Sequence, residues 1–511
     1  MIDAPKVILV PIDSRPVTYS LPQLVALAAG LEAVVPPLAL VGSQQAPTDL
    51  NQLAAWLEHS LSEVKPDALV VCLDAILYGG LVSSRRSDDS LEDVLKRAEG
   101  IAHWKKIGPS RMQVLAQASI MRIPHYDGAT GEPEYWQQYG EKIFQWSVLL
   151  HKDKLEMPTA KRELAILADK IPLAVRQDFL HRRERNFQVN QSLVGSVKSG
   201  QIDYLVFSQD DTKEFGLNVW EKAQLSAQAK AANLSNIALY PGTDEVIMTL
   251  MARWLIGNVG KKPVVCVHFS PDCGKRAPSN FEGQTIEASC LAQARALGLH
   301  LAPPGAGQGE DFTIIIHTAC ERQGDHISLN GACPLPTEDT GQSVQSTLRL
   351  LQEASAPVVL CDVAYSNGSD PLLVEALFSR KDLLKKLCAY AGWNTTGNTI
   401  GSALAMGTAG WYARLHDFPA QEALKRLLFV RFADDWAYQA LVRHQLAGQA
   451  SQERLAQLME PLLKRLANEL EFDPGHVCVR LPWNRTFEVE IAMSQPRNNA
   501  CAGKPSPAGE A

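Results

Sequence analysis

Two adjacent carboxylates, Asp210 and Asp211, are the residues of this chain whose type and spacing most directly suggest chemistry. They follow residues 204–207, a short apolar run rich in aromatic and branched side chains, which is typical of a buried strand in a parallel sheet. In α/β folds, ligands bind at the carboxyl ends of the strands. Two like charges held together must separate their pKa values or share a cation. The structural alternative is an Asx turn or a helix N-cap, which needs only one of the two acids.

The arrangement of an apolar strand followed by polar residues recurs in the first half of the chain. It is found after residues 6–12, after residues 67–73 and after residues 236–240. One such acid is an ordinary N-cap at the start of the next helix. Several strand ends that carry acids at one rim predict a pocket instead. We therefore expect the substrate to be bound, around Asp210 and Asp211, by Asp13, Arg15, Asp74, Tyr78, Asp244 and Glu245.

Two junctions between a loop and a helix extend this pattern into the second half of the chain. Asn367 lies in a polar, glycine-containing loop after the apolar residues 357–361, and Asn394 lies in a segment dense in hydrogen-bond donors. Both junctions suit an anion or a sugar at a helix N-terminus, and both also suit plain helix capping. We expect Asn367 and Asn394 to line the same cleft from a second domain.

The elements that must position these residues alternate between apolar strands and helical stretches. Six strand candidates within residues 1–258 predict a catalytic, parallel α/β domain of TIM-barrel type, complete or partial, with right-handed crossovers. We expect a second α/β domain over residues 261–403, a mainly helical region over 404–494 and a disordered tail over 495–511. The alternative is a pair of doubly wound, Rossmann-like lobes.

The composition is that of an ordinary globular chain. At 511 residues it exceeds the size at which a single core keeps growing. The net charge of −7 and the pI of about 6.0 argue against a nucleic-acid partner. No run approaches the roughly 18 apolar residues of a membrane span, and the N-terminus does not resemble a secretory signal. The ten cysteines include no Cys-x-x-Cys pair, which predicts a cytoplasmic protein with no disulfide framework and no zinc site.

Motifs spread over nearly the whole chain resemble those of a bacterial family catalogued as a domain of unknown function. They are PIDSRP (residues 11–16), LDAILYGGL (73–81), QDD followed by Gly216 (209–216), PGTDE (241–245), SNGSD (366–370), GWNTTGNTIG (392–401), DDWAYQ (434–439) and LPWNRTFE (481–488). This resemblance implies no particular activity. The strand that ends in Asp210 and Asp211 is also similar to that of O-GlcNAcase-like hexosaminidases, which are TIM barrels. That resemblance implies that Asp210 orients a 2-acetamido group as internal nucleophile and that Asp211 is the general acid.

The resulting prediction is a glycoside hydrolase that acts on a small-molecule sugar substrate, with 2-acetamido sugars as the first substrate class and no cofactor. Both aspartates can face one pocket only if the strand has ended at about Gln209, because consecutive side chains of a strand point to opposite faces. Substrate-assisted glycosidases need no second, distant carboxylate, and Asp211 needs a raised pKa to stay protonated near neutrality. Two alternatives remain: a divalent-metal hydrolase that uses clustered carboxylates, and a non-catalytic sugar or metabolite binder built from two α/β lobes.

Overall fold

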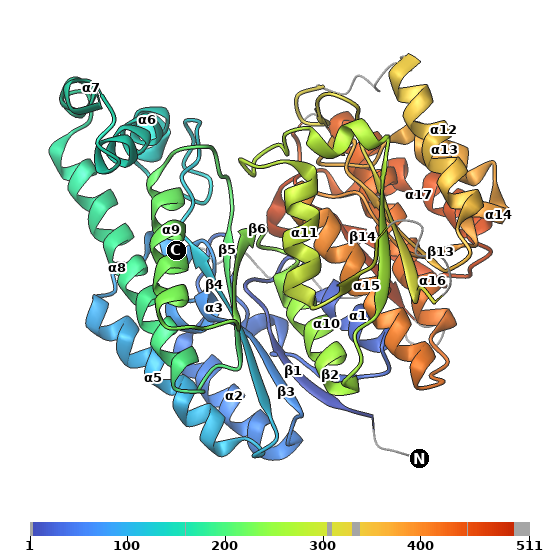
Figure 1. Cartoon of the computed structure of the whole chain (residues 1–511), viewed down its shortest axis with the longest axis horizontal. Helices are drawn as coiled ribbons and strands as arrows, with labels where there is room; N and C mark the ends of the chain where they lie inside the picture. Colours follow the sequence, from blue (N-terminus) through green and yellow to red (C-terminus); the bar gives the residue numbers. More distant parts are fainter. Residues whose placement is uncertain (1–3, 159, 304–308, 330–337, 447, 495–511) are drawn as a thin grey trace.

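Two open parallel sheets lie side by side, and each is covered by helices on both faces (Figure 1). The structure is a computed structural model that describes residues 4–158, 160–303, 309–329, 338–446 and 448–494. The predicted disordered tail, residues 495–511, lies outside the described residues.

The first sheet contains six parallel strands in the order β2-β1-β3-β4-β5-β6. Val7 of β1 pairs with Ala33 of β2 on one side and with Ala68 of β3 on the other, so the chain reverses its winding direction at β1. The strands are Lys6–Val10 (β1), Glu32–Val34 (β2), Ala68–Cys72 (β3), Gln113–Ile120 (β4), Tyr204–Gln209 (β5) and Ile237–Pro241 (β6).

This strand order contradicts the predicted TIM-type barrel. Strands β2 and β6 are the two edges of the sheet, which is therefore open. A barrel requires all its crossover helices on one outer face. Here the connection from β1 to β2 runs opposite to the later ones, so its helix lies on the other face of the sheet. The local alternation of strands and helices is the same in both architectures, which is why the sequence pattern did not distinguish them.

The side chains of the first sheet alternate between two helical layers. Val7 and Leu9 point toward the second sheet and pack with α1 and α10, whereas Ile8 and Val10 pack with α2 on the outer face. The inner helices are Ser20–Ala28 (α1) and Val246–Val259 (α10). The outer helices are Leu50–Val64 (α2), Leu73–Tyr78 (α3), Ser83–Arg86 (α4), Leu91–Ile107 (α5), Leu173–Lys198 (α8) and Leu217–Ala231 (α9).

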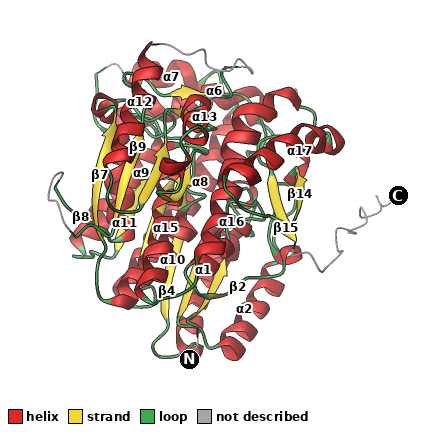
Figure 2. Cartoon of the chain, turned by 90° about the vertical axis from the view of Figure 1, so that its right-hand side faces the viewer, coloured by secondary structure: helices red, strands yellow, loops and turns green. Residues whose placement is uncertain are grey.

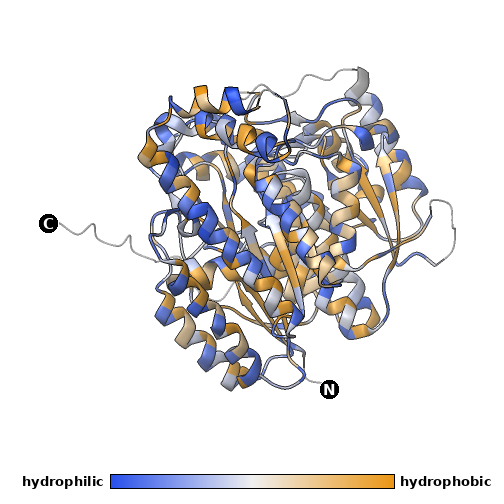
Figure 3. Ribbon diagram, turned by 60° about the vertical axis from the view of Figure 1, so that its left-hand side comes forward, coloured by the Kyte–Doolittle hydropathy of each residue, from blue (hydrophilic) through white to orange (hydrophobic). Residues whose placement is uncertain are grey.

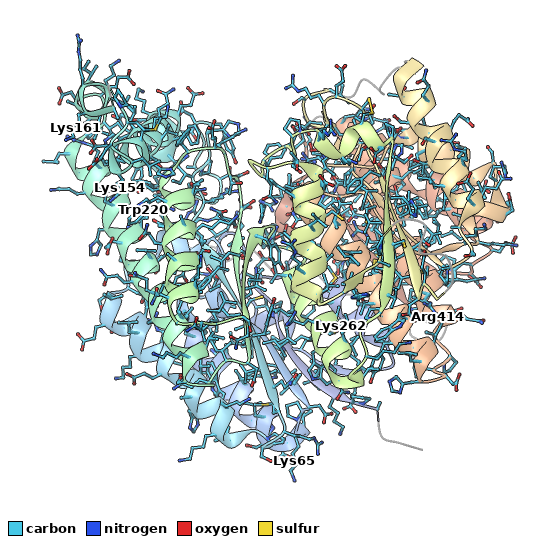
Figure 4. All side chains as sticks on the ribbon, in the orientation of Figure 1. Lys65, Lys154, Lys161, Trp220, Lys262 and Arg414 are labelled. Carbon is cyan, nitrogen blue, oxygen red and sulfur yellow. A yellow bond between two sulfur atoms is a disulfide. The ribbon has the colours of Figure 1, made fainter. Side chains whose placement is uncertain are left out.

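A helical insertion between β4 and α8 stands beside the outer layer of the first lobe. It contains Trp136–Lys154 (α6) and Ala160–Ala168 (α7) and has its own small apolar cluster around Trp136 and Trp146. Lys154 at the end of α6 lies 4.2 Å from the centre of the Trp220 ring on α9, and both residues are labelled in Figure 4. This contact, together with the apolar cluster, fixes the insertion to the lobe.

The second sheet repeats the winding of the first with one strand fewer. Its order is β13-β11-β9-β7-β8, so the first strand of this lobe again lies between the second and the third. This is the arrangement expected for two doubly wound lobes, the alternative to the barrel. The strands are Val264–Ser270 (β7), His300–Leu301 (β8), Phe312–His317 (β9), Val358–Asp362 (β11) and Leu387–Ala391 (β13). Two small sheets are separate from it. One pairs Gly324–Asp325 (β10) with Tyr365–Ser366 (β12), and the other pairs His476–Arg480 (β14) with Glu490–Ser494 (β15).

Helices also cover both faces of the second sheet (Figure 2). Ile286–Leu297 (α11) and Thr396–Leu415 (α15) lie on the face toward the first lobe. The far face and the β13 edge are covered by Glu338–Glu353 (α12), Pro371–Phe378 (α13), Lys381–Leu384 (α14), Gln421–Arg431 (α16), the π-helical segment Phe432–Val442 (η3) and Gln452–Glu469 (α17).

A single apolar core joins the two lobes. It contains Leu9 and Val70 of the first sheet together with Ile314 and Val359 of the second. Helix α15 lies in its centre, and every residue from Thr396 to Ala413 is buried. In Figure 3 the strands are mostly apolar and the outer helices carry the hydrophilic residues. None of the described helices combines the length and the apolar character that a membrane span requires.

One pair of cysteines departs from the prediction of a chain without a disulfide framework. Cys273 and Cys320 are bonded, with their Cα atoms 5.5 Å apart. They lie 47 residues apart in the sequence, in the loops that follow β7 and β9. Only the strand order, which places β7 beside β9, brings these loops together.

Candidate functional site

A cleft of about 510 Å³ lies between the two lobes, at the carboxyl ends of their strands. Its walls contain residues that follow β1, β4, β5 and β6 of the first lobe and β10, β12 and β13 of the second. Because β1 is the strand at which the winding reverses, its end is the position where doubly wound sheets bind their ligands. The predicted site residues that the structure places in this cleft are Asp13, Arg15, Asp210, Asp211, Asp244, Asn367 and Asn394.

Asp74 and Tyr78, also predicted to bind substrate, have other contacts. Helix α3 begins at Leu73, directly after β3, and all six of its side chains are buried. Asp74 accepts a hydrogen bond from the backbone N–H of Ser119 at 2.9 Å. The Tyr78 ring lies 5.2 Å from the guanidinium of Arg185. Both side chains therefore hold α3 against the fold and do not line the cleft.

Glu245 is fully buried at the contact between α10 and α11 and does not line the cleft either. Its Oε1 accepts a hydrogen bond from Gln293 Nε2 at 2.6 Å. Burial raises the pKa of Glu245 to about 8, so this carboxyl is mainly neutral at neutral pH. A Cβ at Gly242 would come within 2.1 Å of the same carboxyl, which explains the glycine three residues earlier. Glu245 therefore belongs to the contact between the lobes.

Asp210 and Asp211 leave β5 where strand pairing ends, at Gln209. Asp211 has a left-handed backbone with φ +47°, which is uncommon for a residue other than glycine. After this turn, Thr212 N donates a hydrogen bond to Phe281 O of the second lobe at 2.7 Å. The turn allows both aspartates to face the cleft, with side-chain exposures of 29% for Asp210 and 13% for Asp211.

Arg122, which follows β4, joins the two carboxylates. Its Nη1 lies 3.3 Å from Asp210 Oδ2 and 3.1 Å from Asp211 Oδ2, and its Nε donates to Glu132 Oε1 at 2.7 Å. Burial is the main cause that raises the pKa of Asp211 to about 6, and the charge of Asp210 raises it further. Arg122 and Arg85 oppose this rise without cancelling it. The pair thus combines a shared cation with one carboxyl that holds its proton more tightly.

Arg15 organises a second group of carboxylates at the end of β1. Its Nε donates to both oxygens of Asp13 at 3.0 and 2.9 Å, and its two Nη atoms contact Asp244 at 3.1 and 2.6 Å. Glu488 lies 3.8 Å away. All four side chains are buried. Burial also raises the pKa of Asp244, against the effect of Arg15. This network connects the ends of β1 and β6 across the base of the cleft.

A comparison with known protein families covers almost the whole chain. The family described as a protein of unknown function, DUF4127, matches residues 7–492. The chain belongs to the DUF4127 family. No curated protein and no solved structure matches it. The predicted resemblance to a family of unknown function is confirmed, whereas the resemblance to hexosaminidases receives no support.

Sequence reasoning missed several residues of the DUF4127 cleft. Trp483 and Arg485 come from the loop between β14 and β15, which lies in the cleft wall. The Trp483 Nε1–H donates to Ser14 Oγ at 2.9 Å, across 469 residues of sequence. The LPWNRTFE motif was the only signal for this loop. Arg122 could have been found, because it follows a strand as Asp13 does.

The divalent-metal hydrolase predicted as an alternative requires several metal-coordinating side chains close together in this DUF4127 protein. Within the described residues, no group of three or more histidine, cysteine, aspartate or glutamate side chains is placed to hold a metal ion. The carboxylates of the cleft contact arginines instead: Asp13 and Asp244 contact Arg15, and Asp210 and Asp211 contact Arg122.

Proposed function

We propose that this protein is a glycoside hydrolase in which Asp211 is the general acid. The observation that carries the proposal is the carboxylate pair at the end of β5, which faces the cleft between the lobes and shares the guanidinium of Arg122. Most enzymes that cleave a glycosidic bond by acid catalysis use two carboxyl groups in different environments.

The difference between the two aspartates supports distinct roles. The Asp211 carboxyl, with a pKa of about 6, donates its proton to the glycosidic oxygen as the bond from that oxygen to the anomeric carbon breaks. The electron pair of the bond leaves with the protonated oxygen. Asp210 is the more exposed carboxylate, and its negative charge stabilises the positive charge that develops on the sugar or orients a 2-acetamido group. A water molecule then forms a bond to the anomeric carbon, and the proton that it loses returns to the Asp211 carboxylate.

The charges of the cleft favour an uncharged sugar. Each of its four arginines already contacts a carboxylate: Arg15 contacts Asp13, Arg85 and Arg122 contact Glu132, and Arg485 contacts Glu488. Among the described residues, every arginine that lines the cleft is therefore already paired, and none is free for a phosphate or a uronic acid. Aromatic side chains in the same wall offer apolar surface for the C–H groups of a sugar ring, namely Tyr126, Phe281, Trp483 and Phe487.

A non-catalytic sugar binder is the second candidate. The position of the cleft between two doubly wound lobes favours it, because a cleft between two domains is a common ligand site. A metal-dependent hydrolase is the third candidate. We also propose a cytoplasmic location, which the lack of a Cys-x-x-Cys pair favours and the Cys273–Cys320 disulfide does not. Tight sugar binding without turnover would support the binder, and loss of turnover in EDTA would support the metal enzyme.

The test is hydrolysis of a panel of nitrophenyl glycosides, 2-acetamido sugars first, with and without EDTA. Asp211→Asn preserves the shape of the side chain but removes the transferable proton. We expect it to lower turnover of natural glycosides by roughly 10²–10⁴. Nitrophenolate leaves without much protonation, so nitrophenyl substrates should be impaired less.

Asp210→Asn serves as the matched variant, because it changes the neighbouring carboxylate on the same arginine. It should impair natural and nitrophenyl glycosides alike, since it acts on the sugar and not on the leaving group. The proposal fails if Asp211→Asn turns over natural glycosides as fast as the unchanged protein. Equal losses in both variants that added manganese restores would point to the metal enzyme.

A further inference from the structure

The second lobe contributes a carbonyl oxygen without a partner to the wall of the cleft. Asn367 lines the cleft and is only 2% exposed. Among the described residues, nothing donates a hydrogen bond to its Oδ1. An oxygen that is buried without a donor loses the hydrogen bonds of water and gains none in return. Its position in a ligand cleft suggests that the donor comes from the ligand.

The orientation of the Asn367 amide is fixed by Asp325. Asn367 Nδ2 donates to Asp325 Oδ1 at 2.8 Å. The Asp325 carboxylate also accepts from Ile327 N at 3.1 Å and from Ser328 Oγ at 2.8 Å. Because an ionised carboxylate can only accept, the amide nitrogen must face Asp325. The oxygen is therefore the amide atom that has no partner among the described residues.

The backbone holds this amide in place. Asn367 has φ +62°, a left-handed conformation that asparagine tolerates better than most residues. Its N–H donates to Asn394 O, in the loop that follows β13, at 2.7 Å. The preceding strand β12 pairs with β10, which carries Asp325. The acceptor is thus positioned before any ligand binds, which lowers the entropic cost of recognition.

We propose that Asn367 is a specificity-determining residue, whose Oδ1 accepts a hydrogen bond from a hydroxyl or an amide N–H of the sugar. This inference rests on the proposed function, because it assumes a sugar in the cleft. It requires a donor at one position of the ligand. A sugar that lacks the donor there leaves the Asn367 oxygen buried and unpaired, so the site discriminates against it.

The test is a binding measurement, so it does not depend on turnover. Asn367→Gly removes the amide, and glycine adopts the left-handed backbone without strain. The control is Asn233→Gly, because Asn233 has a similar φ of +54° but is exposed and lies outside the cleft. Titration calorimetry would compare the methyl β-glycosides of N-acetylglucosamine, glucose and 2-deoxyglucose. We expect Asn367→Gly to weaken binding of a sugar that presents the donor by about threefold to tenfold.

Each pattern of results has a distinct meaning. If Asn367→Gly loses affinity for the acetamido sugar alone, the donor is the amide N–H. If it loses affinity for all but the 2-deoxy sugar, the donor is at position 2. An equal loss of affinity for all three sugars assigns the donor to a hydroxyl at another position. If Asn367→Gly binds every sugar as tightly as Asn233→Gly does, the inference is overturned and the proposed function is not. If the unchanged protein binds no sugar, the proposed function and the inference fail together.

Discussion

Replacing Asp211 by asparagine should stabilise the protein, relative to the unchanged chain, as the pH rises, even though it impairs the proposed chemistry. The side chain is only 13% exposed, and burial is the main reason that its pKa is raised to about 6. A raised carboxyl pKa means that the folded state binds the proton more tightly than the unfolded state. The associated stability is fully present below the ordinary aspartate pKa of 3.8 and is lost as the pH rises through about 6. Asparagine does not ionise and avoids this loss.

The size of the effect follows from the difference between the two pKa values, 3.8 and about 6. One pKa unit corresponds to about 1.4 kcal/mol, so complete ionisation of Asp211 costs the folded state roughly 3 kcal/mol. Part of this cost is already present at mildly acidic pH, because the unfolded aspartate ionises first. Between pH 4.5 and pH 8 the free energy of unfolding of Asp211→Asn should therefore gain about 2 kcal/mol relative to the unchanged protein.

Urea denaturation at these two pH values would measure the gain. The matched control is Asp417→Asn, because Asp417 has a similar left-handed backbone, with φ +51°, but is exposed. The free energy of unfolding of the control should change between the two pH values as much as that of the unchanged protein. An equal change for Asp211→Asn and the unchanged protein would refute the reasoning. A variant that loses stability as the pH rises would show that the ion pair with Arg122 outweighs burial.

Three further outcomes are expected. If Asp211 is the general acid, kcat/KM should fall about tenfold per pH unit above pH 6, and a pH-independent rate would contradict this role. Arg15→Met leaves buried Asp13 and Asp244 without their cation, so the free energy of unfolding measured in urea should fall by about 3–5 kcal/mol. A fall below about 1 kcal/mol would be inconsistent with the network. Burial raises the pKa of Glu245 to about 8, so its ionisation lowers stability as the pH rises through 8. Because the unfolded glutamate already ionises near pH 4.5, part of this loss is present at pH 6, so Glu245→Gln should raise the unfolding temperature more at pH 9 than at pH 6, and equal shifts at both pH values would contradict this assignment.

The position of the aspartate pair could be predicted from the sequence because it depends on local pattern. The apolar run of β5 ends at Gln209, and the polar residues that follow must leave the strand. All strands of a parallel sheet end at the same rim, so the acids after β1, β5 and β6 lie near one another. This reasoning failed for Asp74, because α3 starts immediately after β3 and turns the side chain inward.

Features that depend on contacts between distant segments could not be predicted in this way. The barrel and the open sheet share the same alternation of strands and helices. The choice between them depends on α1, whose Leu21 and Val25 pack toward the second lobe. Trp483 reaches the cleft from a loop near the end of the chain, and nothing close to it in sequence indicates Ser14 as its partner. Likewise, the lack of a partner for Asn367 Oδ1 is visible only once Asp325 has fixed the amide.

The burial of α15 has a consequence for the synthesis of this protein. The first lobe is complete once α10 has been made, but the apolar surface of α10 is covered by α15, which is translated more than a hundred residues later. During that interval the nascent chain exposes a surface rich in leucine, isoleucine and methionine, including Leu250, Met251 and Leu255. Such a surface promotes aggregation. The first lobe therefore needs the second lobe to bury its apolar surface. Residues 1–260 expressed alone should depend on chaperones or form inclusion bodies.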